Sequence, residues 1–240
     1  MKRQEKAIYE RIRDASLKYR LIEEDDRIAV GMSGGKDSLA LLYFLNLMKS
    51  RVPFSFELVP INIDLGFKND ITCLQQYCLL LGYSLHVEST DIGKIAFSSN
   101  RKDSSPCALC AHLRRGALNR TAKNLGCNKT ALGHHMNDVV NTLFMCMIYE
   151  RRFNVFKPRT YLSRMDITVI RPLVYVEESR INDFVSSEGI KPVVNNCPAC
   201  GKTKRKEIDL LVNSLEKLHP GIRQDFLAAI ENVNYECFWQ

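Results

Sequence analysis

The sequence contains no apolar run long enough to cross a membrane and no apolar segment near its first residue that would direct secretion. Internal repeats and low-complexity tracts are also absent. These absences argue against a membrane protein, a secreted protein or a repeat array, and we expect a cytoplasmic protein with no membrane partner. With 240 residues, of which 45% are hydrophobic, the chain is long enough to bury one α/β core.

The nine cysteines are an odd number, and a chain without an export signal meets a reducing environment. We therefore expect metal ligands, reactive thiols or small core residues rather than disulfide bonds. Two pairs have metal-ligand spacing, Cys107 with Cys110 and Cys197 with Cys200. The spacing leaves open whether the pairs share a site and whether the metal is zinc or an iron–sulfur cluster. The others are expected to be buried apolar thiols: Cys73, Cys78, Cys127, Cys146 and Cys237.

Basic residues outnumber acidic residues by 34 to 27, which gives a net charge of +7. They gather in three groups, and such groups are typical of a protein that binds an anionic partner such as nucleic acid. A solvated basic surface without such a partner stays an open alternative. The groups are Arg114, Arg115 and Arg120; Arg151, Arg152, Lys157 and Arg159; and Lys202, Lys204, Arg205 and Lys206.

Short β-branched or apolar runs alternate with segments of helical periodicity. Strands are expected near residues 27–32, 57–63, 84–88 and 129–132, with an edge strand at 167–171, beyond a basic connection over 151–164. Helices are expected over residues 3–18, 39–48, 71–81, 109–125, 138–149, 179–188, 204–218 and 222–233. This alternation predicts an α/β fold with a doubly wound parallel sheet, an N-terminal helix and a C-terminal helical extension.

A glycine-containing loop, Ser33-Gly34-Gly35-Lys36-Asp37-Ser38, follows the first expected strand and opens a helix. Backbone N–H groups and the helix dipole bind phosphate at such a position. The loop is not a Walker A motif, because an aspartate follows its lysine. An acidic residue beside phosphate indicates an intervening Mg²⁺ ion, so Asp37 predicts Mg²⁺ and Lys36 predicts charge neutralisation on a phosphoryl group. An ordinary strand-to-helix turn with a capping serine is the alternative.

A second polar segment, residues 133–138, follows the expected strand at 129–132. It therefore belongs to the carboxyl edge of the sheet, where open α/β folds bind ligands. Asp138 is the candidate for a second metal-binding or ATP-facing residue. The alternative is that Asp138 caps the following helix and that His134 and His135 only pack.

The glycine loop resembles the signature of the PP-loop, or N-type, ATP pyrophosphatases, which have an adenine nucleotide alpha hydrolase-like fold. The resemblance implies cleavage of ATP between its α- and β-phosphates, with an adenylated intermediate. It implies pyrophosphate contacts from Ser33, Gly35, Lys36 and Ser38 within a loop that includes Gly34, and adenine and ribose contacts near Asn62, Ile63 and Gly133. We accordingly divide the chain into an N-terminal helix and linker (1–26), a PP-loop domain (27–195), and a cysteine loop with C-terminal helices (196–240).

Residues 105–116 and 131–138, with the motif at 170–173 and Pro220-Gly221, resemble the tRNA 2-thiocytidine synthetase family over residues 21–233. The resemblance implies ATP- and Mg²⁺-dependent adenylation of a cytidine at position 32 of the anticodon loop, and replacement of its C2 oxygen with sulfur. It implies a 4Fe–4S cluster on three cysteines with one iron open for sulfur. Two ligands map to Cys107 and Cys110. The third is Cys197 by its spacing to Arg205, with Cys200 as the alternative or as a fourth ligand.

We predict catalytic roles for Lys36, Asp37, Asp138 and Arg114. Arg114 is included because it lies beside the cysteine pair in the sequence, and an ion pair on the helix surface is its alternative role. The same resemblance implies tRNA as substrate and a sulfur donor such as a cysteine desulfurase or sulfide, and a homodimer is carried as an open alternative. The sequence departs from the family at Met136-Asn137, where an Arg-Asp pair is expected. Competing interpretations are a 2-thiouridine-forming or lysidine-type PP-loop enzyme, and a tRNA-binding protein with a structural zinc.

Overall fold

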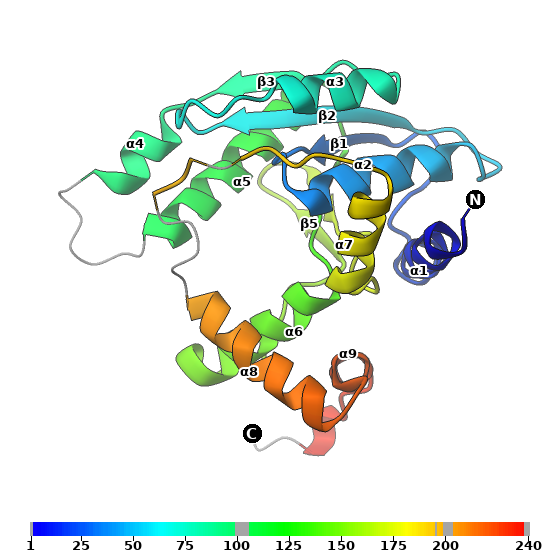
Figure 1. Cartoon of the computed structure of the whole chain (residues 1–240), viewed down its shortest axis with the longest axis vertical. Coiled ribbons are helices and arrows are strands. Elements are labelled where there is room, and N and C mark those ends of the chain that lie inside the picture. The colour runs from blue at the N-terminus through cyan, green and yellow to red at the C-terminus, as the bar shows by residue number, and fades with distance from the viewer. Residues whose placement is uncertain (1, 99–105, 195, 199–203, 238–240) are drawn as a thin grey trace.

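The computed structural model describes residues 2–98, 106–194, 196–198 and 204–237. Six strands form one sheet in the order β3-β2-β1-β4-β6-β5, with helices on both faces (Figure 1). The α/β fold class predicted from the alternation is therefore confirmed. The strands are β1 (Arg27–Gly31), β2 (Glu57–Asp64), β3 (His86–Ser89), β4 (Lys129–Ala131), β5 (Arg159–Leu162) and β6 (Ile167–Ile170).

The pairings β1–β2, β1–β4, β2–β3 and β4–β6 are parallel, whereas β5 pairs with β6 in the antiparallel direction. The prediction of an edge strand at residues 167–171 was therefore wrong. β6 lies between β4 and β5, and all four of its residues are buried, as expected for an interior strand. The edge strand β5 lies within the connection over 151–164. Its residues are half-buried or exposed, so no apolar run marked it in the sequence.

Helices cover both faces of the sheet and pack there into separate apolar clusters. Ile8, Leu41 and Phe184, from α1, α2 and α7, belong to the larger cluster, and Leu118 of α5 packs with Ile61 on the other face. The helices are α1 (Arg3–Tyr19), α2 (Lys36–Lys49), α3 (Thr72–Leu80), α4 (Ile92–Phe97), α5 (Pro106–Asn124), α6 (Met136–Met145), α7 (Glu178–Ser187), α8 (Lys204–Leu218) and α9 (Ile222–Glu231), with a π-helical turn η1 (Cys146–Glu150) and a 3-10 turn η2 (Tyr235–Cys237).

The C-terminal helices α8 and α9 pack against α6 rather than against the sheet (Figure 1). Val140 of α6 and Val212 of α8 are buried together, with Phe226 of α9 packed against them. The first residues of α8 thereby come beside the carboxyl ends of the central strands. None of the helices in the described ranges has the length and apolar character needed to span a membrane. The three-part division of the chain stays a prediction.

A buried ammonium group joins the N-terminal linker to the sheet. Lys129, the first residue of β4, is 3% exposed. Its Nζ lies 2.7 Å from a carboxylate oxygen of Asp26 and 3.0 Å from one of Glu23, and it donates a hydrogen bond to the carbonyl of Leu21. Asp26 is also buried, so each charge in this pair depends on the other for compensation.

We expect Lys129→Met to lower the free energy of unfolding by about 3–5 kcal/mol, because it leaves the buried Asp26 carboxylate without its ammonium partner. Lys123→Met is the matched control. Lys123 pairs with Asp166 at the same distance of 2.7 Å, but on the surface, and its loss should cost less than about 1 kcal/mol. Urea denaturation of both variants measures the difference. Equal, small losses would show that the buried pair contributes no more than the exposed one.

Candidate active site

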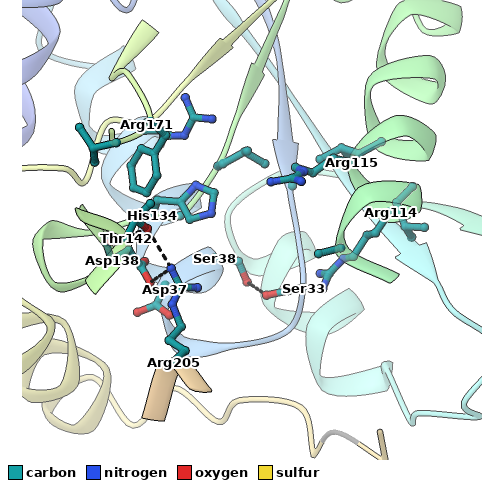
Figure 2. Close-up of a pocket in the computed structure, with 18 of the residues that line it drawn as sticks. Ser33, Asp37, Ser38, Arg114, Arg115, His134, Asp138, Thr142, Arg171 and Arg205 are labelled. Carbon is teal, nitrogen blue, oxygen red and sulfur yellow. Dashed lines mark hydrogen bonds and ion pairs between the residues drawn. The ribbon is translucent and has the colours of Figure 1, made fainter. Parts of the chain in front are cut away.

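The carboxyl ends of β1, β2, β4 and β6 open into one cavity of about 840 Å³ (Figure 2). The glycine loop after β1 lies along its floor, and the segment 133–138 after β4 forms one wall. The opposite wall is α5, and the first turn of α8 closes the lower end. The two polar segments singled out in the sequence therefore meet at one site, as the parallel register of the sheet requires.

The glycine loop folds back on itself and leaves the start of α2 uncapped. Gly34 has a φ of 80°, a conformation that favours glycine. The hydroxyl of Ser38 donates to the Gly35 carbonyl over 2.8 Å, and the Gly35 N–H donates to the hydroxyl of Ser33 over 3.2 Å. No side chain in the described part of the protein caps α2, whose N-cap residue is Gly35. The first N–H groups of α2 thus remain available to phosphate, rather than being satisfied by a capping serine.

Lys36 is held by two carboxylates. Its Nζ lies 2.6 Å from a carboxylate oxygen of Glu178, in the first turn of α7, and 3.2 Å from Oδ1 of Asp37. Burial lowers the pKa of the Lys36 ammonium, but hydrogen bonding and attraction from Glu178 and Asp37 outweigh it, so the pKa is raised. Lys36 therefore stays positively charged. Sequence analysis missed Glu178, because 142 residues separate it from Lys36 and its only local signal is an acidic residue in a helical first turn.

Asp37 and Asp138 lie on either side of one buried imidazole. Nε2 of His135 is 3.7 Å from Oδ1 of Asp37 and 3.6 Å from Oδ2 of Asp138. Oδ1 of Asp37 is buried and accepts no hydrogen bond, even though the Lys36 ammonium is near it. A buried carboxylate oxygen without a donor fits a cation, and carboxylate oxygens are the ligands that Mg²⁺ prefers.

Asp138 also caps helix α6, which was the structural alternative to ligand binding. Its Oδ2 accepts a hydrogen bond from the backbone N–H of His135, which caps α6. Its other oxygen, Oδ1, lies 3.5 Å from a guanidinium nitrogen of Arg205 in the first turn of α8 (Figure 2). Capping and ligand binding are compatible, because each role uses a different oxygen.

The close approach of the two polar segments depends on Gly133. A Cβ atom at this position would lie 3.1 Å from the backbone C and O atoms of Asp37, which is tighter than ordinary van der Waals contact. The backbone after β4 therefore packs directly on the first turn of α2, and any side chain would push Asp37 away.

We expect Gly133→Ala to lower kcat/KM for ATP by about 10- to 100-fold, because small displacements of a catalytic group have effects of this size. Steady-state pyrophosphate release measures it. Gly116→Ala is the control, since a Cβ added at this position of α5 meets nothing within 4 Å. Equal activity of the two variants would show that the contact with Asp37 does not matter.

Asn62 and Ile63, predicted to lie near adenine and ribose, end β2 beside the cavity. Asn62 is 6% exposed, and its amide donates a 2.6 Å hydrogen bond to the carbonyl of Met32, so this side chain joins the ends of β1 and β2. Ile63 lines the main cavity and, with Asn62, a smaller one of about 50 Å³. Their contacts to ATP stay a prediction.

The cysteine site lies at the N-terminal end of α5. Burial raises the pKa of the Cys110 thiol, with further contributions from Cys197 and Cys107, whereas Arg114 lowers it. Three thiols and one guanidinium therefore lie within electrostatic range of one another. Cys200 falls outside the described residues, and within those residues no three His, Cys, Asp or Glu side chains surround one point as ligands of a single ion.

The remaining cysteines match the prediction only in part. Cys78, Cys127 and Cys146 are buried, as expected for apolar thiols. The same prediction was wrong for Cys73 and Cys237, which are exposed. Cys73 lies in the first turn of a short surface helix and Cys237 close to the end of the chain, where there is little core to cover them.

An extended segment after α7 links the glycine loop to Cys197. The backbone N–H of Val193 donates to the Gly34 carbonyl over 2.9 Å, and that of Asn196 donates to Oδ1 of Asn69 over 3.0 Å. Figure 1 shows the segment passing the start of α2 and turning toward the start of α5. Its contacts bring the third predicted cysteine within electrostatic range of Cys110. No motif in the sequence marked this segment.

Arg114 belongs both to the cysteine site and to the cavity of the glycine loop. It lies one turn beyond Cys110 on α5 and lines the cavity together with Ser33 and Asp37. Figure 2 shows its guanidinium pointing toward Ser33. Burial lowers the pKa of Arg114, and Cys110 opposes that shift. The thiols and the glycine loop are thus connected by a single side chain.

Comparisons with known proteins agree with this geometry. The family model of the PP-loop domain matches residues 3–213. A tRNA-cytidine(32) 2-sulfurtransferase of Geobacter sulfurreducens is 40% identical over 218 residues, covering 89% of this chain and 84% of its own. One of Geotalea daltonii is 41% identical over 238 residues, covering 95% and 94%. The chain belongs to the tRNA 2-thiocytidine synthetase family of PP-loop enzymes. It is thereby one of the tRNA sulfurtransferases.

A solved structure supports the fold of this sulfurtransferase. The U34-tRNA thiolase NcsA from Methanococcus maripaludis, determined with its [4Fe-4S] cluster, superposes with a TM-score of 0.74 at 24% identity and covers 97% of this chain and 80% of its own. At this identity the likeness concerns the fold. The family resemblance and the α/β architecture predicted from the sequence are both confirmed, whereas the roles of individual site residues stay predictions.

Proposed function

We propose that this enzyme activates a cytidine of tRNA with ATP and replaces its C2 oxygen with sulfur, at position 32 of the anticodon loop. The observation that carries the proposal is the position of Arg114, which lines the cavity of the glycine loop and lies within electrostatic range of the thiol of Cys110. Base activation and sulfur delivery require neighbouring sites, and this side chain connects them. The names of the sequence relatives support cytidine 32 as the target.

In the proposed activation step, the glycine loop holds the pyrophosphate part of ATP. Lys36 and the N–H groups at the start of α2 stabilise the charge that develops on the phosphoryl oxygens. Asp37 and Asp138 would hold Mg²⁺, which supplies further charge neutralisation when bound. The adenine and ribose would lie near Asn62, Ile63 and Gly133.

The C2 oxygen of cytosine attacks the α-phosphate of ATP, a bond forms between this oxygen and phosphorus, and pyrophosphate leaves. AMP is then a good leaving group on the C2 carbon, and hydrosulfide displaces it. A bond forms between sulfur and C2, the C2–O bond breaks, the oxygen leaves with AMP, and the sulfur loses its proton. Cys107, Cys110 and Cys197 supply three thiolates, a donor set that fits an iron–sulfur cluster or zinc. When bound, a 4Fe–4S cluster would supply the sulfur-carrying chemistry. Arg114 would orient the thiol region toward the activated base.

The partners proposed for the reaction are tRNA and a sulfur donor, either a cysteine desulfurase or sulfide. The basic groups of α5, of the connection after η1 and of the first turn of α8 would contact the RNA backbone. An unpaired base of the anticodon loop can leave its stack and enter the cavity, which is how enzymes reach atoms of a base. A cytoplasmic location and a homodimer belong to the same proposal.

Incubation of the anaerobically reconstituted protein with ATP, Mg²⁺, sulfide and unmodified tRNA tests the function. Mass spectrometry of the digested nucleosides should show a cytidine with sulfur in place of oxygen, formed only in the presence of ATP. A thiolated uridine or a lysine-modified cytidine would contradict the proposal and support another PP-loop activity. A colourless zinc protein without any nucleoside product would support tRNA binding alone.

A further inference from the structure

A guanidinium group that the proposed reaction does not use lines the far wall of the cavity. Arg171 follows β6 directly and is 9% exposed. Its Nη1 donates to the Lys157 carbonyl over 2.6 Å and to the hydroxyl of Thr160 over 3.4 Å, both uncharged acceptors. Its Nε is buried and has no hydrogen-bond partner.

Among the residues that the structure describes, no carboxylate forms an ion pair with Arg171. Its guanidinium carbon lies 4.9 Å from the centre of the Phe156 ring, which packs in turn on the His134 ring at 4.9 Å between centroids. Burial lowers the pKa of His134 to about 4, so this imidazole is neutral at physiological pH. The wall behind Arg171 is therefore aromatic and uncharged.

A second guanidinium faces the same space. Arg115 extends from α5 into the cavity toward the wall that carries His134 and Arg171 (Figure 2). Burial lowers the pKa of Arg171 to about 10, with repulsion from Arg115 as the second cause. No ion pair between a carboxylate and either guanidinium occurs in the ranges that the structure describes. Two cations that face one space, one of them buried, are stabilised by an anion between them.

The position of the pair separates it from the pyrophosphate region. Ser33, Asp37 and Ser38 belong to the glycine loop, and Arg114 points toward Ser33, whereas Arg115 and Arg171 both lie above these residues in the view of Figure 2. Arg205 is also separate, because it is paired with Asp138. The cavity thus has two cationic ends, and the glycine loop accounts for only one of them.

We propose that Arg115 and Arg171 form a second phosphate site, which binds the backbone phosphate of the nucleotide whose base enters the cavity. The inference rests on the proposed function, because it takes an RNA nucleotide as the ligand. Fork-shaped guanidinium groups bind phosphate oxygens in pairs, and Phe156 holds the Arg171 fork in place. A flipped nucleotide brings its own phosphate into the cavity, whereas the pyrophosphate part of ATP lies at the floor.

Binding measurements on Arg115→Gln, Arg171→Gln and Arg171→Lys test the site, with unmodified tRNA and a non-hydrolysable ATP analogue as separate probes. Each glutamine variant should bind tRNA more weakly. The steepness with which the logarithm of the tRNA association constant falls with the logarithm of the salt concentration should decrease by about 0.7–0.9. Arg171→Lys keeps the charge and should keep the slope. Affinity for the ATP analogue should stay within about twofold of wild type. Arg13→Gln removes an exposed guanidinium of α1 and should behave as wild type.

Three outcomes separate the alternatives. Glutamine variants with the same tRNA affinity and salt slope as Arg13→Gln would overturn the inference. Weaker binding of the ATP analogue with unchanged tRNA binding would also overturn it, and would assign the pair to a phosphate of ATP. Arg115 is exposed and makes no hydrogen bond within the described residues, so Arg115→Gln remains informative if Arg171→Gln fails to fold. Failure of the proposed function is recognised separately, as a wild-type protein that binds tRNA but forms no thiolated cytidine.

Discussion

Asp37→Asn should reduce ATP-dependent pyrophosphate release by more than about 100-fold and leave tRNA binding within about twofold of wild type. The buried Oδ1 of Asp37 accepts no hydrogen bond, and the carboxylate lies across His135 from Asp138. An amide keeps the shape of the side chain but loses the negative charge that a cation requires. The basic groups expected to contact tRNA are unchanged, so only the chemical step should fail.

Asp14→Asn is the control for this variant, because Asp14 is an exposed carboxylate of α1 that pairs with its neighbour Arg13 on the surface. Its pyrophosphate release should equal that of wild type. Titration with Mg²⁺ adds a second readout, since Asp37→Asn should need a higher Mg²⁺ concentration for any residual activity. Normal release by Asp37→Asn at the wild-type Mg²⁺ requirement would remove Asp37 from the mechanism.

Cys110→Ser should lower thiolation by more than about 100-fold and abolish the visible iron–sulfur absorbance, while pyrophosphate release stays within a few-fold of wild type. Cys110 lies within electrostatic range of Cys107, Cys197 and Arg114, and it is therefore the thiol chosen for substitution. Separation of the two activities is the informative result, because the glycine loop and Asp37 belong to other elements. Absorbance spectroscopy of anaerobically purified protein and nucleoside mass spectrometry measure the two effects.

Cys73→Ser is the control for cluster loss, since Cys73 is exposed on α3 and has no proposed role. It should keep both colour and activity. Cys197→Ala and Cys200→Ala extend the comparison, and only Cys197→Ala is expected to lose the cluster and thiolation. Loss in Cys200→Ala alone would transfer the third ligand to that residue. Loss of neither activity nor colour in Cys110→Ser would exclude this thiol as a ligand.

Local patterns were sufficient to predict most of the fold. The apolar and β-branched residues of β1 and β2 and the helical periodicity that follows them predicted a parallel sheet, because strands buried on both faces are rich in such residues. The edge strand was misassigned for the same reason. β6 is short and wholly buried, whereas β5 is polar and half-exposed, so its pairing with β6 has no strong local signal.

Some residues of the active site could likewise be predicted from local motifs, whereas others could not. Ser33, Gly34 and Asp37 were identified from one contiguous loop, and Asp138 from its place after a strand, because parallel strands end at one edge. Glu178, which holds Lys36, and Val193, which contacts Gly34, were not identified. Both come from segments far along the chain, and their contacts depend on how α7 packs rather than on any local motif.

The sequence alone determined the phosphate-binding loop, the two pairs of cysteines with metal-ligand spacing, and the alternation that makes a parallel sheet. These features are local, because backbone conformation, helix termini and ligand spacing act over a few residues. Only the tertiary structure decided that Arg114 lines the cavity of the glycine loop within electrostatic range of the Cys110 thiol, and that Arg115 and Arg171 line the same cavity without a described carboxylate partner. Charges from distant segments meet only when the chain folds, since folding alone sets the distances and burial on which their energies depend.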